Sequence, residues 1–197
     1  MLLSWIHTLA AQPRVYDLIQ TISGGRILRK RVSRHFQVCS AGGYIIDAGG
    51  GTGAIRSVVP SGCHYVCLDV DPLKLHDFYT LNKSGAAVLG SAAQMPFPDN
   101  SAEYIFAFGM CHHLTDEELN SALAEFRRAL KPGGRLVLLE PVLAPHRLAS
   151  RILWRLDRGS NPRSADVVAA LIQRHLQIVV EERYAVLHRY ITAVAVK

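Results

Sequence analysis

From residue 44 onward, short apolar runs alternate with segments whose apolar side chains recur every three or four positions. The short runs predict buried strands, and the segments between them predict crossover helices. Near the end of the chain, two runs alternate apolar and polar residues, which is typical of an antiparallel pair. The pattern predicts an α/β fold with helices on both faces of a mostly parallel sheet, its seven strands at 45–48, 64–69, 86–90, 104–108, 135–140, 178–183 and 190–196.

Several of the predicted helices have recognisable ends. Asp71-Pro72 suits the N-cap and the first position of a helix after the second strand. Residues 115–118, Thr-Asp-Glu-Glu, form a capping box, and Lys-Pro-Gly-Gly at 131–134 stops the helix that follows it. A shorter helix is expected at 53–59. These assignments leave Asp69 at the carboxyl end of the second strand, the edge at which open α/β sheets bind ligands.

Amphipathic segments flank this alternating region. Apolar spacing predicts helices at 2–12 and 15–22 and a basic amphipathic helix at 26–34. A second basic helix is expected after the fifth strand, where Arg147, Arg151 and Arg155 form a stripe beside Leu148 and Ile152. Each basic helix could be a docked helix with a solvated face, or a cover for an acidic or lipid-like substrate and a peripheral contact with a membrane.

A single domain is the expected organisation for 197 residues. Residues 1–40 would form a helical lid over the substrate, and residues 41–141 the ligand-binding core. Residues 142–165 would form a cover on the substrate side, and residues 166–197 a closing helix and β-hairpin.

Composition and charge narrow the class of protein. The net charge of +6 favours an acidic partner without choosing one. No apolar run is long enough to cross a bilayer, and the first residues lack a basic n-region, so a cytoplasmic location is expected. The four cysteines lack zinc-site spacing and are interpreted as reduced thiols. No metal is expected at Cys111-His112-His113, because adjacent side chains of a strand point to opposite faces unless the chain makes an irregular turn.

Glycines after the first strand indicate close approach of a ligand to the backbone. Gly49-x-Gly51-x-x-Ala54, with Asp69 about twenty residues on, fits the dinucleotide fingerprint. Asp47 argues against that interpretation, because a carboxylate before the loop would repel a pyrophosphate and attract a cationic amine. S-adenosylmethionine carries such an amine and no phosphate.

Five ordered segments resemble successive motifs of class I S-adenosylmethionine-dependent methyltransferases, most closely the UbiE-like branch. They lie at 47–53, 66–72, 90–100, 109–116 and 130–141. The resemblance implies a Rossmann-like sheet, S-adenosylmethionine as cofactor with S-adenosylhomocysteine as product, and a small-molecule or lipid-like acceptor. Ser91 stands where that family often has an acidic residue, so its adenine contact is a neutral one. By resemblance, the cofactor-binding residues are Asp47, Gly49, Gly50, Gly51, Gly53, Asp69, Val70, Ser91, Ala92, Ala93, Gly109 and Met110.

Methyl transfer is an in-line displacement in which the protein mainly orients the reactants, and a base is needed only for a protonated nucleophile. His113 and then His112 are the candidate catalytic residues, since they follow the fourth strand. His146, Glu140 and Tyr16 are weaker candidates. Two alternatives stay open: an RNA or protein methyltransferase, and a protein that binds the cofactor without transferring methyl. No nucleic-acid module is recognisable, so nucleic acid is not an expected partner.

Overall fold

The computed structural model describes residues 25–35, 42–60, 62–81, 85–157 and 161–197. Strands and helices alternate through most of this range. In chain order they are α3 (Gly25–Ser33), β1 (Tyr44–Ala48), the 3₁₀ turn η1 (Arg56–Val58), β2 (His64–Asp69), α4 (Pro72–Leu81), β3 (Ala86–Leu89), β4 (Ala102–Phe108), the 3₁₀ turn η2 (Cys111–His113), α5 (Asp116–Ala129), β5 (Leu130–Val142), α6 (Leu148–Leu156), α7 (Ala165–Gln173), β6 (Gln177–Ala185) and β7 (Arg189–Val196).

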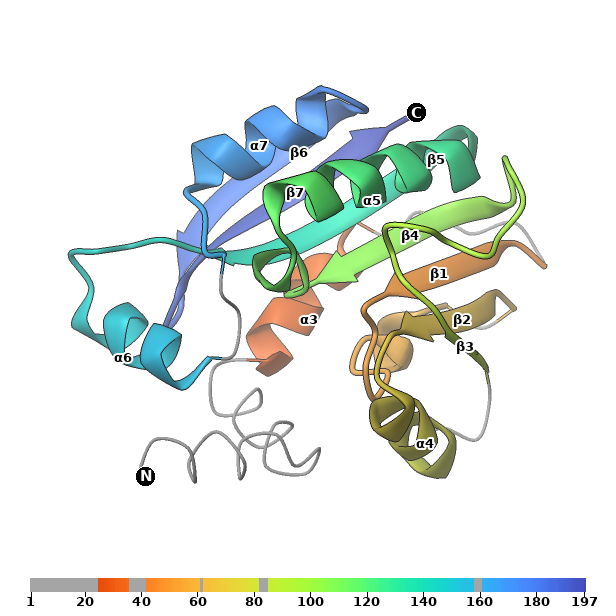
Figure 1. Ribbon diagram of the computed structural model, residues 1–197, viewed down its shortest axis with the longest axis horizontal. Coiled ribbons are helices and arrows are strands. Elements are labelled where there is room, and N and C mark those ends of the chain that lie inside the picture. The colour runs from red at the N-terminus through yellow and green to blue at the C-terminus, as the bar shows by residue number, and fades with distance from the viewer. Residues whose placement is uncertain (1–24, 36–41, 61, 82–84, 158–160) are drawn as a thin grey trace.

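The strands form one seven-stranded sheet in the order β3-β2-β1-β4-β5-β7-β6 (Figure 1). Neighbouring strands from β3 to β5 are parallel, whereas β7 runs antiparallel to both β5 and β6. The predicted fold class is therefore confirmed, including the antiparallel last strand. The order reverses at β1, with β2 on one side and β4 on the other, and such a switch point is where open α/β sheets bind ligands.

Two apolar layers cover the sheet. On one face, α5 and α7 pack through residues such as Phe126 and Ile172 onto Ile46 and Leu138. On the other face, the apolar side chains of α3 and α4 join those of β1, β2 and β4, with Phe78 of α4 fully buried. Figure 1 shows these helix pairs on opposite sides of the sheet. Buried strands of this kind read as continuous apolar runs, which is why Asp47 in β1 stands out.

Two local expectations differ from the structure. The helix predicted at 53–59 is wrong, because only the 3₁₀ turn η1 forms there. Its hydrogen bonds join residues three apart, as from the amide of Arg56 to the carbonyl of Gly53. Gly51 and Gly53 have φ of +57° and +80°, outside the α-helical region, and Pro60 follows closely. The other difference concerns β5, which the sequence predicts to begin at residue 135 but which begins at Leu130 and runs through the stop signal at 131–134, although α5 does end at Ala129.

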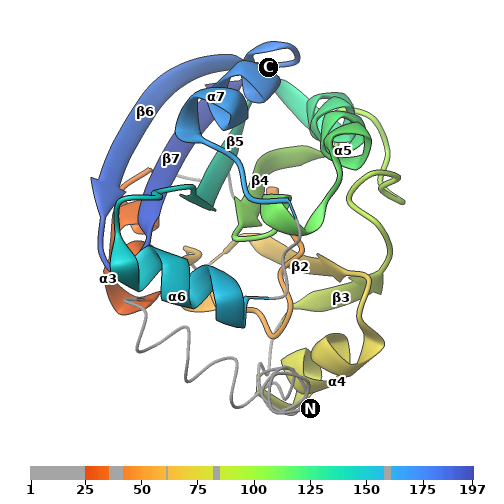
Figure 2. The ribbon, with the colours of Figure 1, turned by 60° about the vertical axis from the view of Figure 1, so that its left-hand side comes forward.

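The basic helix α3 docks on the sheet through its apolar face, whereas the apolar side chains Leu148 and Ile152 of the basic helix α6 are exposed. In α3, Leu28 and Val32 are buried, and Arg31 pairs with Glu182 of β6 and lies over the ring of Tyr184. The α6 helix lies beyond the carboxyl end of β5 (Figures 1 and 2). The helices predicted at 2–12 and 15–22 lie outside the described residues. Among the described helices, none has the length and apolar character needed to cross a bilayer.

The capping box that starts α5 provides a stability test. The Thr115 hydroxyl accepts a hydrogen bond from the amide of Glu118, whose side chain accepts one from the amide of Thr115. We expect Thr115→Ala to lower the free energy of unfolding by about 1 kcal/mol, measured by urea denaturation. Ser121→Ala, an exposed position in the same helix, should change it by less than about half that amount. Equal effects of the two changes would contradict the role of the cap.

Candidate active site

Asp47 lies at the carboxyl end of β1 and is fully buried. Oδ2 accepts a hydrogen bond from the hydroxyl of Tyr65, while Oδ1 has no hydrogen-bond partner among the described residues. Burial raises the pKa of Asp47 to about 7, the Tyr65 hydrogen bond opposes the shift, and the nearby Asp69 adds to it. An unsatisfied oxygen on a buried carboxyl group is unfavourable by itself and calls for a further hydrogen-bond donor.

The glycine loop after β1 packs against Asp47 and against the end of β4. A Cβ on Gly50 would lie 2.6 Å from Cγ of Asp47 and 2.8 Å from Sγ of Cys67. A Cβ on Gly49, whose φ is +68°, would lie 2.8 Å from Cβ of Met110. Side chains at these two positions would therefore displace the groups that define the site. The glycines are required by the packing of the loop as well as by its conformation.

Asp69 holds the loop and the end of β2 together. Its Oδ2 accepts a hydrogen bond from the amide of Gly51 at 2.9 Å, and its Oδ1 accepts one from the amide of Asp71 at 2.9 Å. Asp71 in turn caps α4, accepting from the amide of Leu73, as predicted. Each carboxylate oxygen of Asp69 keeps a second lone pair for a ligand hydroxyl. Asp69 thus places two acceptor atoms at the carboxyl edge of the sheet.

The segment after β3 forms the far end of this edge. Ser91 is exposed, and its hydroxyl accepts a hydrogen bond from the amide of Ala93 at 3.1 Å. Val70 is 68% exposed although it directly follows a buried strand. Arg128 of α5 fixes the following loop by donating to the carbonyls of Met95 and Phe97. An apolar ligand group could cover Val70 while the backbone near Ala92 binds its polar edge.

These groups suit the charge and the hydrogen-bonding groups of S-adenosylmethionine. The buried Asp47 carboxyl group would complement an ammonium, and Asp69 would offer acceptors to two ribose hydroxyls. Gly109, which follows β4, has φ of +60° and brings Met110 against the glycine loop. The structure thus brings the residues expected around the cofactor to one edge of the sheet, and the free Oδ1 of Asp47 is the feature that a ligand would complete.

A second group of polar residues surrounds η2, which follows β4. Glu140 of β5 is buried and accepts hydrogen bonds from the amides of Cys111 and His112, each at 3.0 Å. The same carboxylate is hydrogen-bonded to Nδ1 of His112. On the other side of the ring, Nε2 of His112 lies 3.3 Å from Oδ1 of Asp157, at the end of α6. Both ring nitrogens of His112 are therefore engaged by carboxylates.

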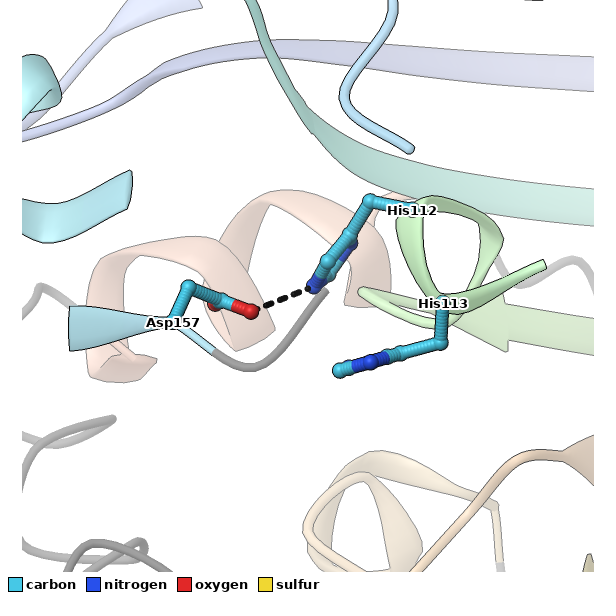
Figure 3. A group of neighbouring side chains, drawn as sticks. All are labelled: His112, His113 and Asp157. Atoms are coloured by element: carbon cyan, nitrogen blue, oxygen red, sulfur yellow. Dashed lines mark ion pairs between the residues drawn. The ribbon is translucent and has the colours of Figure 1, made fainter. Parts of the chain in front are cut away.

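The surroundings shift the pKa values of the two neighbouring histidines in opposite directions. Although burial opposes it, the carboxylates of Glu140 and Asp157 raise the pKa of His112 to about 10. Partial burial and the charge on His112 lower the pKa of His113 to about 4. At neutral pH, His112 is therefore an imidazolium and His113 a neutral ring. Figure 3 shows both side chains projecting from η2 toward Asp157.

The α6 helix rests on this cluster. Trp154 contacts the rings of His112 and His188 edge-on, with centroids 5.4 Å and 5.0 Å away. The hydroxyl oxygen of Ser150 lies 3.2 Å from Nδ1 of His188, within hydrogen-bonding distance. The outer side of α6 exposes Leu148 and Ile152, at 69% and 50%, together with the arginine stripe. The helix thus docks through one face and presents an apolar and basic face outward.

Arg163 lies within the segment 142–165, which is expected to cover the substrate, but its side chain contacts the turn η2. Its side chain is buried and donates to the carbonyls of Cys111 and Leu114 at 2.8 and 2.7 Å, and to Asp116 at 2.8 Å. It therefore fixes the turn that carries the two histidines. Buried guanidinium groups require such a full set of acceptors.

The candidate residues differ in how the structure places them. His112, His113 and Glu140 lie together, whereas His146 is exposed on the loop before α6 and is not in the cluster. Tyr16 lies outside the described residues. Sequence reasoning missed Tyr65 and Asp157. The register of β1 and β2, which pairs Asp47 with Cys67, could have suggested Tyr65 as a neighbour on the same face. No such signal exists in the sequence for Asp157, because it follows the second basic helix, for which two interpretations stay open.

Comparisons with known proteins agree with this geometry. Residues 46–138 match the family described as Methyltransferase domain. The chain is 32% identical over 154 residues to a ubiquinone/menaquinone biosynthesis C-methyltransferase UbiE of Vibrio cholerae, covering 71% of this chain and 57% of that protein. The UbiE protein of Stutzerimonas stutzeri is 36% identical over 148 residues, covering 68% and 55%. The chain therefore spans somewhat more than half the length of these relatives.

A solved structure extends the likeness to almost the whole chain. A chain of the complex between the Haloferax volcanii Trm112 methyltransferase activator and a methyltransferase has a TM-score of 0.78 and 17% identity. The alignment covers 97% of this chain and 96% of that one, and at this identity it shows the fold alone. Together with the matched family and the UbiE relatives, the fold shows that this chain belongs to the class I S-adenosylmethionine-dependent methyltransferases, in their UbiE-like branch.

Proposed function

We propose that this protein transfers the methyl group of S-adenosylmethionine to a small, lipid-like acceptor. The observation that carries the proposal is the buried Asp47 carboxyl group, whose Oδ1 has no partner among the described residues. The cofactor's ammonium would supply the missing donor and the compensating charge. Asp69 would accept hydrogen bonds from the ribose hydroxyls, and Val70 with the Ser91-Ala92-Ala93 segment would contact the adenine.

The glycine loop gives the rest of the cofactor its place. Gly49, Gly50, Gly51 and Gly53 would let the backbone approach the amino-acid part, and Gly109 with Met110 would flank the methionine chain. The methyl group would then face the histidine-bearing turn η2. Orientation and exclusion of water are the main contributions that a protein makes to such a displacement, since the cofactor itself carries the reactive sulfonium.

The proposed acceptor is oxygenated and largely apolar, such as a phenol or quinol. UbiE relatives are named for ubiquinone and menaquinone biosynthesis. The α6 segment, within the cover proposed at 142–165, supports the assignment, because its docked side adjoins His112 through Trp154. The indole N–H of Trp154 is buried and has no acceptor among the described residues. An oxygen of the acceptor would satisfy it.

A lipid-like acceptor would come from a membrane, and the outer face of α6 suits a peripheral contact with an anionic surface. Leu148 and Ile152 are exposed between basic residues, an arrangement that favours the boundary between headgroups and acyl chains. Arg26 and Lys30 of α3, and Arg34 just after this helix, are also exposed. The segments on either side of the core, proposed as lid and cover, would then hold the acceptor over the cofactor.

The proposed catalytic roles fall on the histidine pair. His113 is neutral at physiological pH and belongs to the turn η2, which follows β4 at the edge of the sheet where the methyl group would lie. His112 is charged and engaged on both sides, so it would position His113 and neutralise the two carboxylates around it. A carbanion-like ring carbon or a phenolate would need no base, whereas a protonated oxygen would.

Thermal shift and product analysis test this function together. We expect S-adenosylmethionine and S-adenosylhomocysteine each to raise the melting temperature by several degrees at about a hundred times the Kd, while NAD has no effect. Quinol-like acceptors presented in anionic vesicles should yield a product heavier by one methylene, measured by mass spectrometry.

Stabilisation by NAD alone would overturn the proposal. A methylated RNA, bound with a steep salt dependence, would establish the first alternative instead. Cofactor binding without any methylated product across acceptor classes would establish the second.

The Asp47→Asn variant tests the proposed contact with the ammonium while preserving the fold. The amide preserves the size of the side chain and an acceptor for Tyr65, but it removes the negative charge. We expect the affinity for S-adenosylmethionine to fall at least about tenfold, because a charged partner is lost. The unliganded variant should be at least as stable as the parent protein at pH 8, since the buried charge is gone. Unchanged cofactor affinity in calorimetry would contradict the assignment.

A further inference from the structure

Three potential metal ligands converge where the histidine-bearing turn meets the end of α6. One ligand atom each from His112, His113 and Asp157 lie within 4.8 Å of one another (Figure 3). The rings of His112 and His113 have centroids 4.2 Å apart. The objection from strand geometry does not apply here, because the two histidines lie on the 3₁₀ turn η2 and not on a strand. The turn brings both rings to the same side.

The surroundings of His112 resemble those of a metal-bound histidine. Its Nδ1 is hydrogen-bonded to the buried Glu140, whose two oxygens are also fixed by the amides of Cys111 and His112. Histidine ligands in proteins commonly donate their second ring N–H to a carboxylate, which fixes the tautomer and the orientation of the ring. In the metal-bound form, Nδ1 would stay protonated toward Glu140, and the ion would displace the Nε2 proton of the His112 imidazolium, so that the Nε2 lone pair faces the same point as Asp157.

The distance between His112 and Asp157 is consistent with a shared ion. Nε2 of His112 and Oδ1 of Asp157 are 3.3 Å apart. Charge-assisted hydrogen bonds between such groups are typically about 2.7–2.9 Å long. Two ligand atoms bound at about 2.0–2.1 Å to one tetrahedral ion lie about 3.3 Å apart. His113 is exposed on one side, so its ring can rotate toward the same point.

We propose that His112, His113 and Asp157 bind a first-row divalent transition metal ion, with a coordination position left open beside the cofactor edge. Two imidazole nitrogens and one carboxylate oxygen favour such an ion over magnesium or calcium. The negative charges of Glu140 and Asp157 offset the positive charge of the ion. The positive charge of Lys74, near His113, disfavours binding of the ion. On the function proposed above, the open position would coordinate an oxygen of the acceptor and orient it toward the methyl group.

Zinc and cobalt binding to the full-length protein tests the site. After treatment with a chelator, one Zn²⁺ per chain should bind and raise the melting temperature, and Mg²⁺ should not. Co²⁺ should give the intense visible absorption of a tetrahedral site. We expect His113→Ala and Asp157→Asn each to weaken Zn²⁺ binding at least about tenfold. His146→Ala removes an exposed histidine outside the cluster and should leave binding unchanged.

Two results would overturn the proposal. Zn²⁺ binding that is equal in His113→Ala, Asp157→Asn and the parent protein would place the ion elsewhere. Absence of stabilisation by Zn²⁺, with Asp157→Asn lowering the melting temperature of the metal-free protein, would show that His112 and Asp157 form only an ion pair. The shift caused by S-adenosylmethionine is measured in parallel on each variant. This shift should persist in each variant, because Asp47 and Asp69 are not ligands of the proposed metal ion. Failure of the metal site and failure of the proposed function are therefore distinguishable.

Discussion

A carboxyl group buried without a full set of partners is the constraint on which this site depends. Asp47 interrupts an otherwise apolar strand at the centre of the sheet, and only Tyr65 contacts its carboxyl oxygens through a described hydrogen bond. Burial makes the ionised form unfavourable, so the free protein gains stability as the pH falls below about 7 and Asp47 takes up a proton. A cationic ligand reverses that preference. The unfavourable burial of an ionised Asp47 in the free protein is thus a source of selectivity for an ammonium over a phosphate.

The sheet brings this carboxyl group close to the histidine-bearing turn. Parallel strands β1, β2 and β4 end at the same edge, so the glycine loop, Asp69 and the residues after Phe108 become neighbours. Met110 contacts the glycine loop directly, and His112 reaches Glu140 of the adjacent β5. Arg163 then holds the turn from the far side. The residues proposed to bind the cofactor and the candidate catalytic residues are therefore parts of one packed edge.

The sequence predicted most of this arrangement, because periodicity and turn chemistry are local. The strands, the cap at Asp71 and the capping box at Thr115 all follow from neighbouring residues, and the structure confirms them. One failure is local, because the conformations of Gly51 and Gly53 prevent a regular helix at residues 53–59. The other failures involve contacts distant in sequence. The residues next to Arg163 do not indicate that its side chain is buried, which follows only from the packing of the 161–163 segment on η2. Asp157 became a candidate only once α6 was seen beside His112.

The most direct test of the account is the number of protons released when S-adenosylmethionine binds. With a pKa of about 7, roughly three-quarters of Asp47 in the free protein is protonated at about pH 6.5. The cofactor's own amine is almost fully charged at that pH. Calorimetry in buffers of different ionisation enthalpy should therefore show release of about 0.7 proton per cofactor bound, and no release in Asp47→Asn. Binding without proton release in the parent protein would contradict the central claim that Asp47 holds the ammonium.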